Sequence, residues 1–316
     1  MTPRAPGYFG PAGGPCSSDL RSSEALGRRS LVGAGLVLRE TRPPGVPTAV
    51  TTTPAPGLAV VTGASTGIGR ALAMEFAAHG FDLVLTAEEP QVHAAAAEAA
   101  RNGIVISAIE VDLATHHGVE ALNERVLAQP SPVTALALNA GMGVHGRFDR
   151  TGVEDDLRLV DLNVRSVVHL AKLVLPGMVE RRRGRVLFTS SIAGRAPGPF
   201  HATYAASKAF VHSLSEALRY ELKDTGVTTT SLLPGPTDTA FFERADMQET
   251  RIARGPKDSP ESVARDAFEA LMAGKDHVVA GSPLNKAMTA GSAFVPDRVA
   301  AAVAARETTP IDKEKQ

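Results

Sequence analysis

The sequence of 316 residues predicts an α/β protein in which a doubly wound parallel sheet lies between two layers of helices. Two observations carry this prediction. Short segments that are apolar throughout recur along residues 58–281, and amphipathic segments of helical spacing separate them. Strands that are apolar on both faces are typical of a parallel sheet with helices on both sides. We therefore expect a single three-layer α/β/α domain.

The expected elements alternate along the chain from residue 58. The first strand, LAVVTGAS at 58–65, runs into a glycine turn, and a helix over 66–80 follows it and is closed by a glycine. The other strands are expected at 81–87, 105–113, 133–141, 184–191, 227–235 and 277–281. The other helices are expected at 91–102, 119–127, 153–182, 201–224 and 259–274, with one or two weaker helices within 283–306.

Composition divides the chain into three parts. Residues 1–56 are rich in Pro, Gly, Ser, Thr and Arg, so we expect a disordered tail, or an extension that the mature protein lacks. Residues 57–283 hold the expected α/β domain, and residues 284–316 are expected to form a helical extension that ends in a frayed tail.

Charge and cysteine content limit the classes of partner. The 33 basic and 34 acidic residues give a net charge of -1, so we expect neither nucleic acid nor an anionic membrane surface as a partner. The single cysteine, Cys16, excludes an internal disulfide and fits a cytoplasmic protein. No run of eighteen apolar residues occurs, so we expect no membrane span. Two arginines precede a short apolar run at 31–38, but no cleavage site follows, and export is not expected.

A glycine-rich segment joins the first strand to the first helix. TGASTGIG at 62–69 places Gly63, Gly67 and Gly69 where unpaired N–H groups of a helix N-terminus meet a tight turn. Glycines there let a pyrophosphate approach the backbone, and the positive end of the helix dipole favours the anion. This position in the first strand–helix unit favours a dinucleotide site over a plain turn.

A phenol and an ammonium lie four residues apart in YAASK, at Tyr204 and Lys208. Residues four apart lie on the same face of a helix, so both side chains can reach one site. A phenol ordinarily loses its proton near pH ~10, and a fixed cation beside it favours the phenolate. Taken alone, the pair is more typical of a half-buried aromatic beside a solvated lysine than of a catalytic site.

Together these motifs resemble those of the short-chain dehydrogenase/reductase family. TGASTGIG, LNAG at 138–141, SSIAG followed by YAASK, and PGPTDT at 234–239 occur in the order and spacing of that family, over roughly residues 57–283. The resemblance implies a Rossmann-type fold, a nicotinamide cofactor and an alcohol or carbonyl compound as substrate. It also implies a homodimer or homotetramer that pairs the helices near 153–182 and 201–224.

The resemblance implies four catalytic residues. Tyr204 would exchange a proton with the substrate oxygen, and Lys208 would lower the Tyr204 pKa and bind the nicotinamide ribose. Ser191, thirteen residues before Tyr204, would donate a hydrogen bond to the substrate oxygen, whereas Ser190 is out of register by one. Asn163 would hold a water that links Lys208 to solvent, unless it only satisfies the backbone at a helix bend.

The resemblance also implies a set of residues at the cofactor. Asn139 and Gly141 would lie beside the adenosine ribose, and Asp112 near the adenine, although an Asp at a strand end also starts turns. Pro234, Gly235 and Thr239 would line the nicotinamide side. The full set is Gly63, Ser65, Thr66, Gly67, Ile68, Gly69, Glu88, Asp112, Leu113, Asn139, Ala140, Gly141, Tyr204, Lys208, Pro234, Gly235, Thr237 and Thr239.

Cofactor choice depends on the residues after the second strand. Ala87 stands where NAD-preferring relatives have Asp, and Glu88 follows it. The Glu88 carboxylate would accept hydrogen bonds from the ribose hydroxyls of NAD and would repel the 2′-phosphate of NADP. Thr66 stands where a basic residue would favour NADP. We therefore expect NAD(H) to be favoured over NADP(H), with Arg70 and Arg101 as cations that could still bind a phosphate.

Two other functions share this fold. One is a catalytically silent cofactor-binding sensor or regulator, and the other is an epimerase or dehydratase that retains its nicotinamide. The intact Ser191, Tyr204 and Lys208 argue against the first, and the modest length after Pro234 argues against the second. No metal is expected, because His116 and His117 lack spaced partners in the sequence.

Overall fold

The structure is a computed structural model that describes residues 56–100, 104–281 and 296–309. By its contacts the chain divides into two units, Met1–Val50 and Thr51–Gln316, and every described residue belongs to the second. The expected tail up to residue 55, with Cys16 and the short apolar run, lies outside the described residues. So do Arg101, Asn102 and the first part of the expected C-terminal helices.

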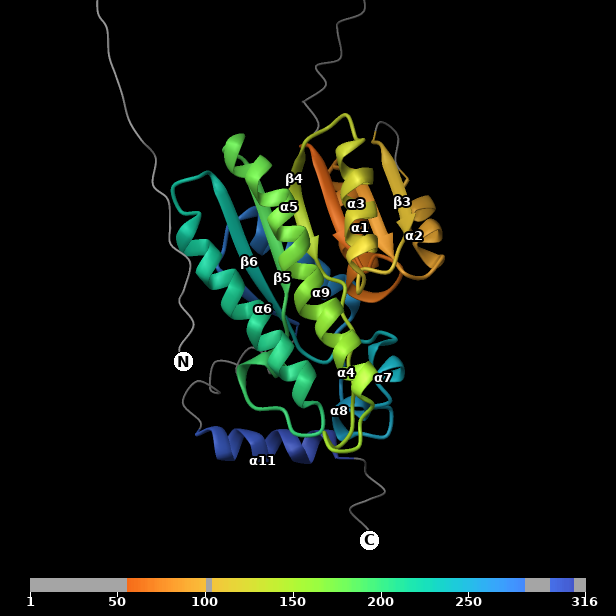
Figure 1. Ribbon diagram of the computed structural model, residues 1–316, viewed down its shortest axis with the longest axis vertical. Coiled ribbons are helices and arrows are strands. Elements are labelled where there is room, and N and C mark those ends of the chain that lie inside the picture. Colours follow the sequence, from red (N-terminus) through yellow and green to blue (C-terminus); the bar gives the residue numbers. More distant parts are fainter. Residues whose placement is uncertain (1–55, 101–103, 282–295, 310–316) are drawn as a thin grey trace, which may run out of the picture. The chain divides into compact units, whose positions relative to one another are not determined.

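Seven parallel strands form one sheet in the order β3-β2-β1-β4-β5-β6-β7 (Figure 1). This is the expected doubly wound sheet, because the chain moves outward from β1 through β2 to β3 and then returns to start the other half at β4. The strands are β1 (Leu58–Thr62), β2 (Asp82–Ala87), β3 (Ile106–Glu110), β4 (Val133–Leu138), β5 (Gly184–Thr189), β6 (Val227–Pro234) and β7 (His277–Ala280).

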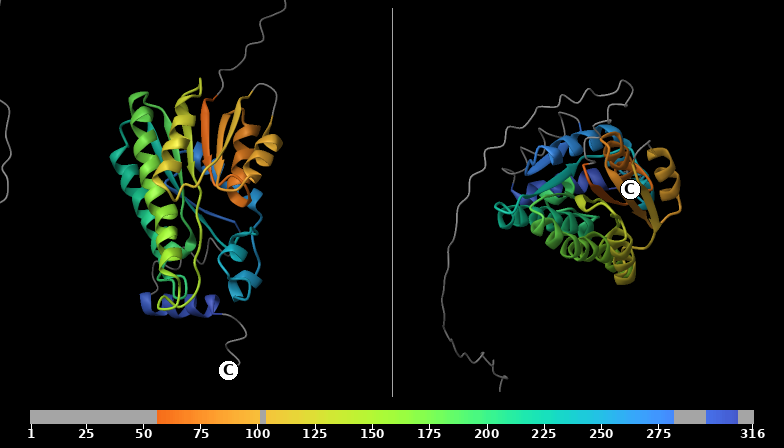
Figure 2. Two further views of the ribbon diagram at one scale, coloured as in Figure 1. Left: turned by 45° about the vertical axis from the view of Figure 1, so that its right-hand side comes forward. Right: turned by 90° about the horizontal axis from the view of Figure 1, so that it is seen from above.

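Helices cover both faces of the sheet and give the expected three layers (Figure 2). One face packs against α1 (Gly67–Ala78), α2 (Gln91–Ala99) and α9 (Pro260–Met272). The other packs against α3 (His116–Leu127), α5 (Ser166–Glu180) and α6 (Ala202–Glu221). Each of these six helices lies on the connection between one strand and the next strand along the chain, because two parallel strands need such a crossover connection.

Strand β1 shows why apolar residues fill the first four positions of a central strand. Successive side chains point to opposite faces, so Ala59 and Val61 enter the core with α1, while Leu58 and Val60 enter the core with α3 and α5. All five residues of β1 are buried. A polar residue at either set of positions would be buried in one of the two cores.

The long helix expected at 153–182 is divided in the structure. It consists of α4 (Val153–Val160), a π-helical turn η1 (Asp161–Arg165) and α5. By length and apolar composition the continuous stretch Val153–Glu180 could cross a membrane, the only such stretch among the described residues. This is weak evidence for a span, because a helix that packs its apolar face on a sheet, as α5 does, passes the same test.

Several boundaries differ from the sequence prediction. The first strand ends at Thr62, before Gly63, and the helix expected from Val119 begins at His116 because Thr115 Oγ1 caps it by accepting from Gly118 N at 3.0 Å. Three short elements were not expected: η2 (Ile192–Arg195), α7 (Phe241–Arg244) and α8 (Arg251–Arg254). The helix α11 (Asp297–Thr308) lies where a weak C-terminal helix was expected and extends two residues beyond it.

Candidate functional site

A cleft of about 850 Å³ lies at the carboxyl ends of the strands. Residues that directly follow β1, β3, β4, β5 and β6 all line it, and so does the last residue of β2. Ligands of doubly wound sheets bind at this edge, where the strand order reverses between β1 and β4. All the predicted cofactor residues line the cleft, and so do Ser191, Tyr204 and Lys208.

The glycine loop has no room for side chains at its tightest points. Gly63 has a φ of +66°, a left-handed conformation that side chains disfavour. A Cβ on Gly69 would lie 2.0 Å from the carbonyl oxygen of Gly63, so the first turn of α1 packs directly on the loop. Thr62 Oγ1 accepts from the backbone N–H groups of Asn139 and Ala140, both at 2.9 Å, and so ties the end of β1 to the end of β4. This close approach of bare backbone fits a pyrophosphate at the start of α1.

Three charged side chains meet beside the ends of β2 and β3. Arg158, on α4, donates to Glu88 Oε1 at 2.9 Å and to Asp112 Oδ2 at 2.9 Å. Asp112 Oδ1 also accepts from Ala114 N at 2.8 Å, so this residue starts a turn as well as lining the cleft. No sequence motif pointed to Arg158, because it reaches Glu88 across 70 positions of the chain.

A second charged group joins the glycine loop to the segment after β6. Ser65 Oγ donates to Glu89 Oε2 at 2.9 Å, and Arg244 of α7 lies 3.3 Å from Glu89 Oε1. Arg244 also donates to Thr66 Oγ1 at 3.2 Å. Glu89 rather than Glu88 is therefore the carboxylate in contact with the loop. The sequence analysis assigned a role to neither Glu89 nor Arg244.

One cation that was expected as a possible phosphate ligand has another partner. Arg70 forms an ion pair with Glu98 of α2. The guanidinium is thereby held on the surface between α1 and α2, and Arg70 is not among the residues that line the cleft. Arg158 and Arg244 take its place as the arginines that line the cleft among the described residues.

The helix α6 presents Tyr204 and Lys208 to the cleft one turn apart, opposite Ser191 at the end of β5. Burial raises the pKa of the Tyr204 phenol to about 12, and a hydrogen bond with Ser191 acts in the opposite direction. Burial lowers the pKa of the Lys208 ammonium to about 8. Lys208 Nζ donates to the carbonyl oxygen of Thr189 at 2.9 Å and lies 5.7 Å from the centre of the Tyr204 ring.

The adjacent serines have different hydrogen-bond partners. Ser191 caps η2, its Oγ accepting from Ala193 N at 3.1 Å, and it faces the phenol. Ser190 Oγ instead donates to the backbone carbonyl of Lys208 at 2.7 Å. Ser190 therefore fixes the helix that carries the catalytic pair, and Ser191 is the hydroxyl beside Tyr204.

Asn163 lies in the π-helical turn and is buried. Its Oδ1 accepts from Met142 N at 2.9 Å, while its Nδ2 donates to Met142 O at 2.9 Å and to Ser207 Oγ at 3.1 Å. A Cβ on Gly141 would lie 3.1 Å from Lys208 Nζ and 3.2 Å from Asn163 Oδ1. The side chain of Asn163 thus holds the loop after β4 against α6, close to the ammonium.

The segment after β6 lines the opposite wall. Pro234 ends β6, and Thr237 Oγ1 donates to Gly235 O at 3.0 Å, which fixes the turn. Thr239 Oγ1 accepts from Phe241 N at 3.2 Å, and its methyl group would be 2.8 Å from a Cβ on Gly67. This segment therefore packs on the glycine loop as well as on the catalytic side of the cleft.

The far end of the cleft is mostly apolar. Its lining includes Met142, Phe241, Phe242, Met247, Ile252 and, from α11, Ala300, Val303 and Ala304. Helix α11 is held there at its last residue, because Thr308 Oγ1 donates to Pro199 O at 3.0 Å and Thr308 O lies 2.8 Å from His145 Nε2. His201 is buried beside Tyr204, and burial lowers its pKa to about 4, so it is neutral at physiological pH.

Comparison with known families identifies the chain. The sequence model of the short chain dehydrogenase family matches residues 57–250. The chain belongs to this family. As a short-chain dehydrogenase it is an NAD(P)-dependent dehydrogenase or reductase, which agrees with the resemblance seen in its motifs. The chain is 32% identical over 249 residues to a very-long-chain 3-oxoacyl-CoA reductase of Mycosarcoma maydis, covering 75% of this chain and 67% of that protein.

Two solved structures of short-chain dehydrogenases share the fold. One, from Burkholderia phymatum, is in complex with NAD and superposes with a TM-score of 0.69 at 26% identity, covering 74% of this chain and 92% of that chain. The other, from Sphingobium yanoikuyae, is in complex with NADPH and superposes with a TM-score of 0.66 at 28% identity, covering 76% and 96%. Members of this fold thus bind either form of the nicotinamide cofactor.

Proposed function

We propose that this short-chain dehydrogenase interconverts a secondary alcohol and a ketone, or reduces an aldehyde, with Tyr204 as the general acid and base. The observation that carries the proposal is the convergence of Ser191, Tyr204 and Lys208 in the same cleft as the glycine loop. The bound cofactor supplies or accepts the hydride. Intact catalytic residues argue against a silent sensor, and the described residues contain no separate substrate domain of the kind epimerases use.

Each residue has a task that follows from its surroundings. Tyr204 keeps its proton at neutral pH and is the donor to the substrate oxygen during reduction. Ser191 donates to the same oxygen, where negative charge develops. Lys208, still largely charged below its pKa of about 8, stabilises the phenolate that remains and binds the cofactor ribose. Asn163 positions Lys208 through the loop after β4, and a water bound near it would carry protons to solvent.

We propose that NAD(H) is favoured over NADP(H). Five charged side chains line the cleft near the glycine loop and the ends of β2 and β3, namely Glu88, Glu89, Asp112, Arg158 and Arg244. They carry an excess of one negative charge, which disfavours an added phosphate dianion. Arg158 opposes this preference, because its guanidinium, which pairs with Glu88, could turn and bind a 2′-phosphate instead.

The substrate is a bulky apolar alcohol or carbonyl compound. The apolar part of the cleft, to which α7 and α11 contribute lining residues, supports this class, and so does the similarity to an enzyme that reduces very-long-chain 3-oxoacyl-CoA. A panel of ketones and aldehydes of increasing apolar size, assayed with NADH and NADPH, tests both proposals. Turnover restricted to small polar substrates contradicts the substrate class, and a preference for NADPH contradicts the cofactor choice.

We further propose a homodimer or homotetramer that pairs α4 and α5 with α6 of a second copy. Large apolar side chains on these helices are exposed, among them Leu157, Phe210 and Tyr220. Light scattering at micromolar concentration tests this, and a monomer contradicts it. The cytoplasmic location stays a prediction of the cysteine content.

A further inference from the structure

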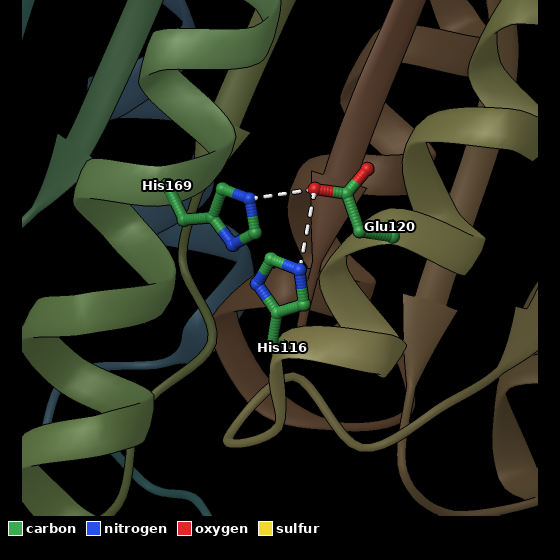
Figure 3. Close-up of side chains that lie close together, drawn as sticks. All are labelled: His116, Glu120 and His169. Carbon is green, nitrogen blue, oxygen red and sulfur yellow. Dashed lines mark hydrogen bonds and ion pairs between the residues drawn. The ribbon is translucent and has the colours of Figure 1, made fainter.

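Three metal-ligating side chains lie together outside the cleft, at the surface between α3 and α5 (Figure 3). His116 and Glu120 are four residues apart on α3, and His169 reaches them from α5. No spaced partner of His116 was expected from the sequence, but Glu120 shares its helix face and the fold brings His169 close to both. No residue of this cluster lines the cleft.

The two imidazole rings are aligned on one carboxylate oxygen. His169 Nε2 lies 2.8 Å from Glu120 Oε1, and His116 Nε2 lies 3.9 Å from the same atom. The rings are stacked, with centres 4.8 Å apart and planes 9° from parallel. One ligand atom from each residue lies within 4.8 Å of the others. Two nitrogens and one oxygen therefore lie close together, and one of the near-parallel rings must turn for both nitrogens to point at one ion.

This donor set matches a known class of metal site. Two histidines and a glutamate, with water in the fourth position, bind Zn²⁺ in many proteins, with metal–ligand distances of roughly 2.0–2.2 Å. Tetrahedral ligand atoms at such distances are about 3.4 Å apart, so His116 Nε2 must move closer to Glu120 Oε1, while His169 Nε2, now 2.8 Å from that oxygen, must move slightly away. The side chain of His116 is 75% exposed and free to make this movement, whereas that of His169 is 22% exposed and already held.

We propose that His116, Glu120 and His169 bind a divalent transition metal of the Zn²⁺ class, which joins α3 to α5. Imidazole and carboxylate ligands select Zn²⁺, Co²⁺, Ni²⁺ or Cu²⁺ over Mg²⁺ and Ca²⁺, which prefer oxygen ligands alone. The role is structural, because the ligands lie outside the cleft and connect two helices of the same layer. Arg158 and Asn163 precede α5 on the same continuous helical stretch, so the metal would also steady the segment that positions them.

The experiment titrates Zn²⁺ into the full-length, tag-free protein and follows binding by calorimetry. We expect one Zn²⁺ per chain with a dissociation constant on the order of 1–10 μM. At a hundredfold excess over that constant the melting temperature should rise by roughly 5 °C, since a ligand that binds only the folded state stabilises it. Co²⁺ should give the visible absorption of a tetrahedral site, and Mg²⁺ should not compete.

Matched variants locate the site. His116→Ala and Glu120→Gln each should weaken Zn²⁺ binding by roughly tenfold or more, because each removes one of three ligands. Neither should affect folding, since one residue is exposed and the other keeps its shape. His117→Ala is the control, because His117 is the exposed neighbour of His116 on α3 and should leave binding unchanged. Absence of 1:1 binding in the wild type, or wild-type affinity in both His116→Ala and Glu120→Gln, overturns the proposal.

Discussion

The cleft has a proposed catalytic end, around Tyr204 and Lys208, and a glycine-loop end, around Glu88 and Arg158. These two ends hold their polar groups in different ways. At the catalytic end, Lys208 and Asn163 are 5% and 1% exposed and bond to backbone atoms or buried side chains. At the glycine-loop end, the side chains of Glu88 and Arg158 are 59% and 38% exposed and bond mainly to other charged groups. The first arrangement is fixed by packing, and the second by pairs of charges in contact with water.

This difference separates chemistry from cofactor choice. Burial shifts the pKa of both Tyr204 and Lys208. The protonation states at the catalytic end therefore depend on close packing, which a substitution there would disturb. Exposed ion pairs contribute about 0–1 kcal/mol each and rearrange easily. We therefore expect substitutions at the catalytic end to abolish turnover, and substitutions at the glycine-loop end to change the preferred cofactor while turnover persists.

The largest effect is expected for Tyr204→Phe. It removes the proton donor, so kcat should fall by roughly 10²–10⁴-fold, while the dissociation constant of the cofactor stays within about twofold. Steady-state rates and cofactor fluorescence titration measure the two quantities. Tyr220→Phe is the matched control, because Tyr220 is 73% exposed on the same helix. Retention of more than a few per cent of the wild-type rate in Tyr204→Phe would end the proposed role.

The pH dependence of the free energy of unfolding tests whether Lys208 is held in a buried site. Its pKa is lowered to about 8 from 10.5, so the folded state binds fewer protons than the unfolded state between those values. The resulting destabilisation is complete below pH 8 and disappears as pH rises toward 10.5. The free energy of unfolding should thus gain up to about 3 kcal/mol from Lys208 as pH rises between the two pKa values, since a difference of one in pKa corresponds to about 1.4 kcal/mol.

Urea unfolding at about pH 7.5, 9 and 10 compares the wild type with Lys208→Met, which lacks the titrating group. Other groups contribute to the pH dependence of both proteins, so the difference between the two curves isolates Lys208. An equal pH dependence in the two would show that this ammonium is not held in a buried site.

Glu88→Arg sharpens the contrast from the other end. It replaces the carboxylate that pairs with Arg158 and supplies a second cation, so the ratio of kcat/KM for NADP(H) to that for NAD(H) should rise roughly ten- to a hundredfold. The kcat with the better cofactor should stay within a few-fold of the wild type. Glu124→Arg, at an exposed position of α3 outside the cleft, is the control for added charge. A loss of kcat with both cofactors in Glu88→Arg would argue against two separable ends.

The smallest effect is expected from deletion of residues 1–50, which belong to the other unit of the chain. Their sequence lacks the hydrophobic periodicity of a packed helix or strand, so neither turnover nor cofactor binding should depend on them. The melting temperature and kcat/KM of the truncated protein should equal those of the full chain. A lower melting temperature would show that this segment packs on the catalytic domain.

The sequence could predict what local patterns encode. Fully apolar strands gave the parallel sheet, and the thirteen-residue spacing distinguished Ser191 from Ser190, whose hydroxyl bonds to the backbone of Lys208. Arg158 and Arg244 escaped prediction because each reaches its partner through the tertiary fold, across 70 and 155 positions for Glu88 and Glu89. Helices of four residues, such as α7 and α8, are too short to show a helical period.

The π-helical turn at Asp161–Arg165 sets how far α4 is rotated about the helix axis relative to α5. Such a turn holds about one residue more than an α-helical turn, and one residue corresponds to about 100° around the helix axis. If the same residues formed a uniform α-helix instead, the extra residue would turn α4, with Arg158, by about that angle relative to α5. The π-helical turn therefore sets the direction in which Arg158 points from the helix, independently of which side chains the turn carries.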